Sequence, residues 1–431
     1  MSAALARSAY ALLLRLLQPA YVLRLWLRGR AEPLYRHAIG ARFGFYGQVT
    51  GSESGTGRVW VHAVSLGETR AAAALIEALR SERPGVRLLL THGTATGLEA
   101  GRALLLDGDR QTWLPYDTPG AVNRFFERFQ PAVGVLMETE IWPTLLRIAK
   151  ARDVPMILAN ARLSAKSLAR GRQFEALLRP AVESLSLVLA QTDDDAQRLR
   201  AAGAARVEVS GNLKYDLTPD PAQRAQGAAW RAQVRGEGGR QVVLAAITRE
   251  GEEAMLLAAW TRRPASNDLL LIVPRHPQRF DEVAAQVGAA GLTLARRSGW
   301  GDTPPPDALS AQVWLGDSMR EMALYYASAD VALLGGSFAP LGGHNLIEAA
   351  ACGCPLVMGP STFNFKEAAE LSLAAGASMQ VADMGAGVEA ASALLRDPQR
   401  LARFSAAALQ FATQHRGAAV HMAQRIATLM R

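Results

Sequence analysis

The stretch RVWVHAVSLGETRAAAALIEALRSERPGVRLLLTHG, residues 58–93, decides the fold because it holds one complete strand–helix–strand unit. Residues 58–65 and 86–93 are rich in β-branched and aliphatic side chains, as buried strands are. Residues 66–85 between them have the alanine-rich pattern of a helix and end in Pro and Gly. A strand, a helix and a second strand in such close succession predict a parallel βαβ unit.

The same alternation continues along most of the chain. Further strands of a first domain are expected at 132–138, 154–160, 185–191 and 206–212. After an interruption, strands are expected again at 241–247, 269–275, 292–296, 313–317, 331–337 and 355–360. Two such runs predict an α/β protein with two Rossmann-like, doubly wound parallel-sheet domains whose strand carboxyl ends face a cleft.

Changes in composition set the expected domain boundaries. Residues 1–30 form an apolar and basic segment, and residues 31–215 form the first Rossmann-like domain. Residues 216–240 are polar and rich in Pro and Gly, which is typical of a linker. Residues 241–405 form the second domain, and residues 406–431 are expected to form a helix that packs back on the N-terminal domain.

The N-terminal segment MSAALARSAYALLLRLLQPAYVLRLWLRGR, residues 1–30, is predicted to associate with a membrane. Arg15 would lie near the centre of a membrane span, which is costly. Leucine and tryptophan interleaved with arginine favour a helix that lies in an anionic membrane surface. A short signal-anchor with snorkelling arginines and an ordinary amphipathic helix packed on the domain are the alternatives. On either membrane interpretation the positive flank indicates the cytoplasmic side.

The charge of the chain narrows the classes of partner. The 431 residues carry a net charge of +8, almost all of it from arginine, with lysine only at 150, 166, 214 and 366. Arginine suits phosphate and carboxylate partners, although a GC-rich genome would explain the same composition. The sequence has no GxxxxGK[ST], no strand-linked GxGxxG and no HExxH or Cys/His cluster. These absences argue against an NTPase, a dehydrogenase and a catalytic metal; neither a cofactor nor a nucleic-acid partner is expected.

Charged residues gather where the predicted strands of the first domain end. Glu68 lies in the first turn of a helix, where it either pairs with the helix dipole or serves as a general base at the mouth of the cleft. Glu138 and Glu140 directly follow a buried strand, which points to function rather than to structure alone. Lys214 lies where the last strand of this domain ends, and could neutralise a phosphate or a carboxylate.

The second domain has its own candidate residues. Arg275 and His276 lie between two prolines, so this stiff loop is a plausible phosphate clamp, although His276 alone fits a structural role equally well. The stretch GGSFAPLGGHNLIEAAACGCP, residues 335–355, has two glycine pairs that allow close backbone approach. It then starts a helix whose free N–H groups suit an anion. Glu348 either accepts hydrogen bonds from ribose hydroxyls or caps that helix.

The motifs HAVSLGE, METEIWP, NARLS, GNLKYD, PRHP and GGSF…GGHNLIEAAACGCP occur in this order. Over about residues 30–375 the chain thereby resembles the 3-deoxy-D-manno-octulosonic acid (Kdo) transferases of lipid A biosynthesis, which are GT-B glycosyltransferases. The resemblance implies inverting, metal-independent transfer of Kdo from the donor CMP-Kdo to a lipid A precursor (lipid IVA). It also implies the cytoplasmic side of the inner membrane. The alternatives are another GT-B enzyme with a different nucleotide sugar and a membrane-attached nucleotide-binding protein without catalysis.

The resemblance also implies roles for individual residues. Glu68 matches the general base, and Glu138 and Lys214 match positions that support the transition state. The expected CMP-binding residues are Pro274, Arg275, Met319, Arg320, Glu321, Asn345, Leu346, Ile347 and Glu348, to which the glycine-rich loop adds Gly336 and Ser337. Arg320 departs from the family pattern, in which a small residue, often Gly, is expected. A contact through the backbone would survive that departure.

Overall fold

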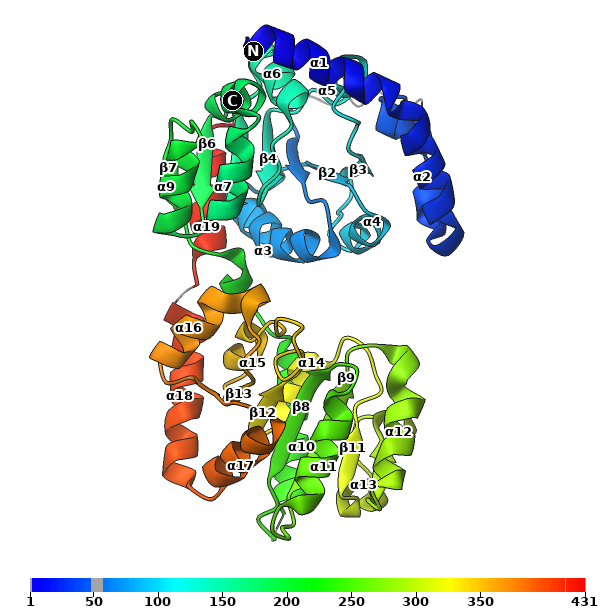
Figure 1. Cartoon of the computed structure of the whole chain (residues 1–431), viewed down its shortest axis with the longest axis vertical. Helices are drawn as coiled ribbons and strands as arrows, with labels where there is room; N and C mark the ends of the chain where they lie inside the picture. The colour runs from blue at the N-terminus through cyan, green and yellow to red at the C-terminus, as the bar shows by residue number, and fades with distance from the viewer. Residues whose placement is uncertain (1, 48–56, 217, 237, 415, 431) are drawn as a thin grey trace. The chain divides into compact units, whose positions relative to one another are not determined.

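The computed structural model describes residues 2–47, 57–216, 218–236, 238–414 and 416–430. The chain divides into two compact units (Figure 1). The first comprises Met1–Asp216 and His415–Arg431, and the second comprises Leu217–Gln414. The chain therefore passes from one unit to the other twice.

The first unit is built on a parallel sheet of seven strands in the order β3-β2-β1-β4-β5-β6-β7. Val59 is in register with Leu88 on one side and with Val133 on the other, so the expected βαβ unit is present. Strand β3 was not predicted, because only one of its four residues is fully buried. The strands are β1 (Val59–His62), β2 (Leu88–His92), β3 (Arg110–Trp113), β4 (Val133–Met137), β5 (Met156–Ala161), β6 (Leu187–Ala190) and β7 (Val207–Val209).

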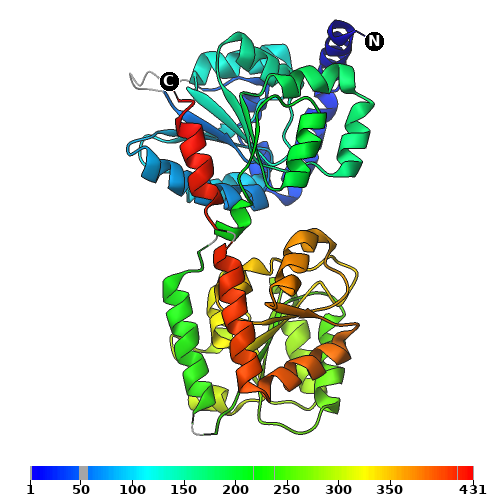
Figure 2. The same ribbon diagram turned by 90° about the vertical axis from the view of Figure 1, so that its left-hand side faces the viewer.

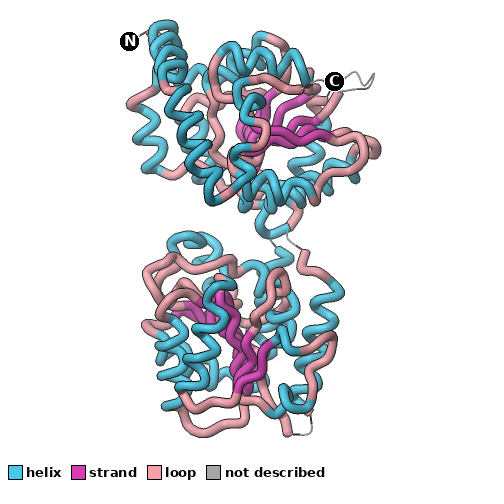
Figure 3. The backbone as a smooth tube through the Cα atoms, turned by 90° about the vertical axis from the view of Figure 1, so that its right-hand side faces the viewer, coloured by secondary structure: helices cyan, strands magenta, loops and turns pink. Residues whose placement is uncertain are grey.

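Helices cover both faces of this sheet (Figure 3). Apolar side chains of α3 and α19 form the core with one face, and those of α5, α6, α8 and α9 with the other. The helices are α1 (Ala3–Leu16), α2 (Gln18–Ala31), α3 (Leu66–Glu82), α4 (Ala95–Arg102), α5 (Pro119–Phe129), α6 (Pro143–Ala151), α7 (Ala165–Arg172), α8 (Glu175–Glu183), α9 (Asp193–Ala201) and α19 (Ala418–Ala427).

The C-terminal residues form two helices rather than one. Helix α18 (Pro398–Gln414) belongs to the second unit, and α19 belongs to the first, where Figure 2 shows it in red. Met422 and Ile426 of α19 are fully buried in the core that α3 shares. Asp216 holds the start of α19, since its carboxylate accepts hydrogen bonds from Gly417 N and Ala419 N at 2.6 Å each.

The N-terminal segment forms α1 and α2, with a break at Leu17 before Pro19. Tyr10 anchors α1 through a hydrogen bond of 3.0 Å from its hydroxyl to the buried Asp117. Many of the apolar side chains of both helices are exposed, namely Leu5, Leu12, Leu13, Leu16, Leu17, Val22, Leu23, Trp26 and Leu27. Within the described ranges, no helix has both the length and the apolar character that crossing a bilayer requires.

The second unit is built on another parallel sheet of seven strands, in the order β10-β11-β9-β8-β12-β13-β14. The expectation of two doubly wound parallel-sheet α/β domains is therefore confirmed. The strands are β8 (Val242–Thr248), β9 (Leu269–Pro274), β10 (Leu294–Arg296), β11 (Val313–Leu315), β12 (Val331–Leu334), β13 (Leu356–Met358) and β14 (Ser378–Gln380).

Most of the stretch predicted as a linker, residues 216–240, is helical instead. Helix α10 (Pro221–Arg235) packs on α14 so closely that a side chain at Gly227 would lie 2.2 Å from the Leu324 carbonyl oxygen. Trp230 of α10 is buried, so the prediction of a free linker there is wrong. The other helices are α11 (Glu252–Arg262), α12 (Phe280–Ala289), α13 (Pro306–Ser310), α14 (Met322–Ser328), α15 (Ile347–Ala351), α16 (Lys366–Ala374), α17 (Met384–Leu395) and α18.

Candidate functional site

The first unit brings its candidate residues to the point where the strand order reverses. The chain leaves β1 for β2 on one side, and β4 is the neighbour of β1 on the other side. In sheets of this kind, ligands bind beyond the carboxyl ends of the strands at such a switch point. Glu68 follows β1, and Glu138 and Glu140 follow β4, so the acidic residues flank this point.

Glu68 is held at the start of α3 by its own helix. Ser65 caps the helix, and the Glu68 carboxylate accepts hydrogen bonds from Val64 N at 2.8 Å and from the Ser65 hydroxyl at 3.1 Å. Burial raises the pKa of Glu68 above its usual value, and the charge of Glu138 adds to this, while the bonds from Val64 and Ser65 act against it. The capping role is therefore present, together with the raised pKa that suits a general base.

Glu138 directly follows β4 in a strained conformation. Its φ of +59° lies in the left-handed region, which is uncommon for a residue with a side chain and is frequent at functional sites. Its carboxylate is largely buried and pairs with Arg162, which follows β5, at 3.0 Å. The backbone and this ion pair thus fix the Glu138 carboxylate beside Glu68.

Lys214 lies on a short 3-10 helix (Leu213–Asp216) that packs against α3. The buried Asn160 positions this turn, since its side-chain oxygen accepts a hydrogen bond from Leu213 N at 3.1 Å. Asn212 adds a second bond, from Lys214 N, at 3.0 Å. The structure therefore places Lys214 in the same unit as Glu68 and Glu138.

The second unit gathers positive charge at its own switch point, between β8 and β12. His344, in the loop after β12, is half-buried, and burial lowers its pKa to about 4. The charges of Arg275, Arg249 and His276 lower it further, so these residues lie close enough to act electrostatically on the imidazole. Among the described residues, no group hydrogen-bonds to His344 Nε2. A neutral imidazole among cations is an arrangement that suits a bound anion.

The glycine-rich loop is organised around a carboxylate. Glu252 is fully buried, and its two oxygens accept hydrogen bonds from Arg249 N (2.9 Å), Gly336 N (2.8 Å), Phe338 N (3.1 Å) and Ala339 N (3.2 Å). Glu252 therefore occupies the backbone N–H groups of Gly336, Phe338 and Ala339 in this loop.

The structure changes the interpretation of two residues that were expected to bind CMP, Ser337 and Gly336. The Ser337 hydroxyl is fully buried, donating to the Leu334 carbonyl at 2.5 Å and accepting from Gly359 N at 2.8 Å. Gly336 has a φ of +70°, and a side chain there would lie 3.2 Å from the His344 ring. We therefore revise the interpretation of both residues, which shape the loop under His344 instead of offering polar groups to a ligand.

The remaining expected CMP residues lie at strand ends of the same sheet. Pro274 is the last residue of β9. Asn345 Oδ1 accepts a hydrogen bond of 3.1 Å from the N–H of Ile347, the first residue of α15. Leu346 and Ile347 are buried, so only their backbone is available to a ligand, and Glu348 is half-buried near the Cys352 thiol. The helix that starts here, α15, has only five residues, fewer than expected.

The backbone conformation of residues 319–321 accounts for the glycine that the family pattern often has at the position of Arg320. Arg320 has a φ of +68°, a conformation that glycine adopts more easily than any other residue. Its carbonyl oxygen accepts a hydrogen bond from Gln223 Nε2 at 2.9 Å, and Met319 is exposed. Glu321 is paired with Arg297 through two contacts of 3.0 and 3.1 Å.

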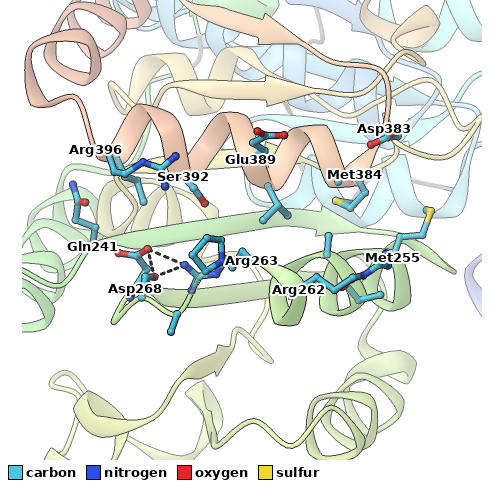
Figure 4. Close-up of a pocket in the computed structure, with 18 of the residues that line it drawn as sticks. Gln241, Met255, Arg262, Arg263, Asp268, Asp383, Met384, Glu389, Ser392 and Arg396 are labelled. Atoms are coloured by element: carbon cyan, nitrogen blue, oxygen red, sulfur yellow. Dashed lines mark hydrogen bonds and ion pairs between the residues drawn. The ribbon is translucent and has the colours of Figure 1, made fainter.

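A separate groove lies away from these strand ends. It runs between α11 and α17, has a volume of about 1180 Å³ and is lined by Met255, Arg262, Met384 and Glu389 among others (Figure 4). Arg263 at its edge is paired with Asp268 at 3.0 Å. None of the predicted site residues lines this groove.

Several residues of the two clusters were not predicted from the sequence: Arg162, Arg249, Glu252, His344 and His62, which lies 4.0 Å from Glu140. Arg162 and Arg249 follow predicted strands directly, so the rule that found Glu138 would have found them too. Nothing in the sequence pattern marked Glu252, because the loop that it binds lies 84 residues further along the chain.

Comparisons with known proteins identify the family of the chain. Residues 37–217 match the family model described as 3-Deoxy-D-manno-octulosonic-acid transferase (kdotransferase). The chain is 47% identical over 423 residues to the 3-deoxy-D-manno-octulosonic acid transferase of Bordetella pertussis, covering 96% of each chain. It is 33% identical to that of Haemophilus influenzae, again covering 96% of each. The fold is similar to that of UDP-GlcNAc 2-epimerase from Neisseria meningitidis, with a TM-score of 0.56 at 14% identity, over 86% of this chain and 99% of that one.

Proposed function

The chain belongs to the family of 3-deoxy-D-manno-octulosonic acid (Kdo) transferases, glycosyltransferases of lipopolysaccharide synthesis, and from this premise we propose how it transfers Kdo. The donor is CMP-Kdo, and the acceptor is a hydroxyl of a lipid A precursor. Glu68 is the general base, and transfer proceeds with inversion and without a metal. The observation that carries this proposal is Glu68 itself, a carboxylate of raised pKa at the switch point of the first sheet.

The chemical step follows from the position of Glu68. Its carboxylate takes the proton of the acceptor hydroxyl while the hydroxyl oxygen forms a bond to the anomeric carbon of Kdo. The bond from that carbon to the phosphate oxygen breaks on the opposite side, and CMP leaves with the electron pair. A raised pKa makes Glu68 a stronger base than an exposed carboxylate, provided that it is ionised at the working pH.

The groups around His344 support the departure of CMP. Negative charge builds on the phosphate as it leaves, and Arg275 and Arg249 lie where they can offset that charge. His344 Nε2 can accept or donate one hydrogen bond there, depending on its tautomer. Cationic side chains then stabilise the negative charge on the departing phosphate, as a metal ion does in other transferases.

Glu138 and Lys214 act beside the base in this proposal. Glu138 is fixed by Arg162 and raises the pKa of Glu68, which strengthens the base. Lys214 lies on the turn that packs against α3, where its ammonium suits the Kdo carboxylate or the phosphate.

The exposed apolar side chains of α1 and α2 support a membrane-bound acceptor. Leu12, Leu13 and Leu16 on α1 are each more than half exposed, and Trp26 on α2 lies under the guanidinium groups of Arg30 and Arg36 at 4.4 and 5.1 Å. Leucine and tryptophan beside arginine suit an interfacial helix on an anionic membrane. We place this surface on the cytoplasmic side of the inner membrane, where it would bring the site to its lipid acceptor.

Mass spectrometry of the reaction products tests the function. The purified chain is incubated with a lipid A precursor and either CMP-Kdo or a UDP-sugar. Product that gains the mass of one or more Kdo units with CMP-Kdo alone supports the proposal, and transfer from the UDP-sugar alone contradicts it.

A further inference from the structure

Close to the proposed base lies a pair of titratable residues that the mechanism does not use, the buried His62 and the partly buried Glu140. His62, the last residue of β1, is fully buried, and its Nε2 lies 4.0 Å from Oε2 of Glu140. This separation is about 1 Å longer than a hydrogen bond, so a small side-chain movement would close it. Among the described residues, His62 Nε2 has no hydrogen-bond partner.

The other ring nitrogen of His62 has partners. Nδ1 lies 3.0 Å from the Thr91 carbonyl oxygen and 2.9 Å from the Thr91 hydroxyl oxygen. Burial lowers the pKa of His62 to about 3, so the ring is neutral. When Nδ1 carries the proton and donates it to the Thr91 carbonyl, Nε2 is a lone-pair acceptor that faces Glu140.

The charges of two further carboxyl groups, those of Glu68 and Glu138, act on Glu140. Burial raises the pKa of Glu140 to about 7, the charges of Glu68 and Glu138 add to the rise, and the nearby Trp142 indole lowers it. Two cations come from neighbouring elements: Arg162 binds Glu138 at 3.0 Å, and Lys214 lies on the turn that packs against α3. Because like charges repel and both pKa values are raised, Glu68 and Glu140 do not both ionise readily near neutral pH.

We propose that Glu140 keeps one proton and directs it toward His62 Nε2, so that Glu68 beside it stays ionised and ready to act as the base. Glu140 is then a positioning residue, since it acts through Glu68 and does not touch the reacting atoms. This inference rests on the proposed function, because it presumes that Glu68 is the base.

The proposal predicts how each substitution changes the pH dependence of activity. Glu140→Gln mimics the protonated acid permanently, so Glu68 titrates beside a neutral neighbour at every pH. His62→Asn keeps a polar atom at the place of Nδ1 but removes Nε2, so Glu140 loses the acceptor for its proton and ionises at lower pH. Its carboxylate then raises the pKa of Glu68, and the acidic limb of the activity profile moves to higher pH. His62→Gln restores a polar atom at the place of Nε2.

The experiment records kcat/KM for Kdo transfer from pH 5 to 9. The wild type is expected to show an acidic limb and an inflection near pH 7. Glu140→Gln should lose the inflection, His62→Asn should move the acidic limb upward by at least half a pH unit, and His62→Gln should reverse that movement. Glu77→Gln, an exposed position on the same helix as Glu68, is the control and should match the wild type.

Thermal unfolding provides a second readout that does not depend on activity. Because the pKa of Glu140 is raised in the folded chain, its contribution to stability is present below about pH 4.5 and is lost as the pH rises to about 7. The Tm of Glu140→Gln relative to the wild type should therefore increase from pH 5 to pH 8. The proposal is overturned if this Tm difference is independent of pH, or if Glu140→Gln keeps the inflection. Full activity of Glu68→Gln would instead contradict the proposed function.

Discussion

At the scale of single residues, Glu68 combines two roles that are often treated as alternatives. Its carboxylate satisfies Val64 N and the Ser65 hydroxyl at the start of α3, and the same contacts hold it at the switch point. A capping carboxylate is therefore a well-positioned base, because its orientation is fixed before the substrate arrives.

Arg275 offers a test of the donor site at this scale. Its side chain is exposed beside His344, so Arg275→Ala should weaken CMP binding by about tenfold or more through the loss of a charge-assisted hydrogen bond. Isothermal titration calorimetry with CMP measures the affinity. Arg262→Ala, on an exposed face of the same unit, is the control. Equal affinity of the wild type and Arg275→Ala would remove Arg275 from the site.

Some of the candidate site residues could be predicted from the sequence, and others could not. Glu68, Glu138 and Lys214 were predicted because polar residues at the ends of apolar strands are visible in the pattern. Ser337 and Gly336 were assigned to CMP because their glycine-rich surroundings suggest close backbone approach. The close approach is real, but it is to Glu252 and His344, which only the folded chain brings there.

At the scale of elements, the loop after β12 depends on a carboxylate from α11. Glu252 accepts four backbone hydrogen bonds, and one of them comes from the N–H of Arg249, whose charge acts on His344. Bonds to a buried charged group are stronger than those between neutral groups.

Glu252→Gln should therefore disturb both the loop and donor binding. The glutamine side chain has one acceptor oxygen, so two of the N–H groups would face an NH₂ donor, at a cost of about 1–3 kcal/mol for each. We expect a Tm several degrees lower and CMP affinity reduced at least tenfold, with Glu389→Gln, an exposed glutamate of α17, as the control. A variant with the Tm and CMP affinity of the wild type would show that the loop does not need this carboxylate.

Secondary structure was most plainly predictable where strands are apolar throughout. Strands β1, β4 and β8 are almost wholly buried, and the sequence showed them plainly. Strands β3 and β14 were missed because most of their residues are only partly buried or exposed. Helix α10 was taken for a linker because Pro221 and Gly236 enclose a polar stretch, although its Trp230 and Val234 are buried.

At the scale of the whole molecule, the last residues of the chain complete its first unit. Met422 and Ile426 of α19 share a core with residues of α3 that lie some 350 positions earlier. Arg425 adds an ion pair with Glu208 at 2.6 Å.

Deletion of residues 415–431 should therefore destabilise the first unit selectively. Loss of two large buried side chains costs about 4–10 kcal/mol, taking about 2–5 kcal/mol for each. Differential scanning calorimetry should show the transition of the first unit at lower temperature, while CMP binding by the second unit persists. Unchanged unfolding of the first unit would contradict the role of α19 in its core.

The central claim, that Glu68 is the base for Kdo transfer, is tested most directly by Glu68→Gln. Glutamine keeps the shape of the side chain but cannot take the proton, so transfer measured by mass spectrometry with CMP-Kdo and a lipid A precursor should fall by at least about a hundredfold. CMP affinity should stay that of the wild type, because the CMP site is proposed to lie in the second unit, and Glu77→Gln on the same helix should transfer Kdo normally. Near-normal transfer by Glu68→Gln would contradict the account.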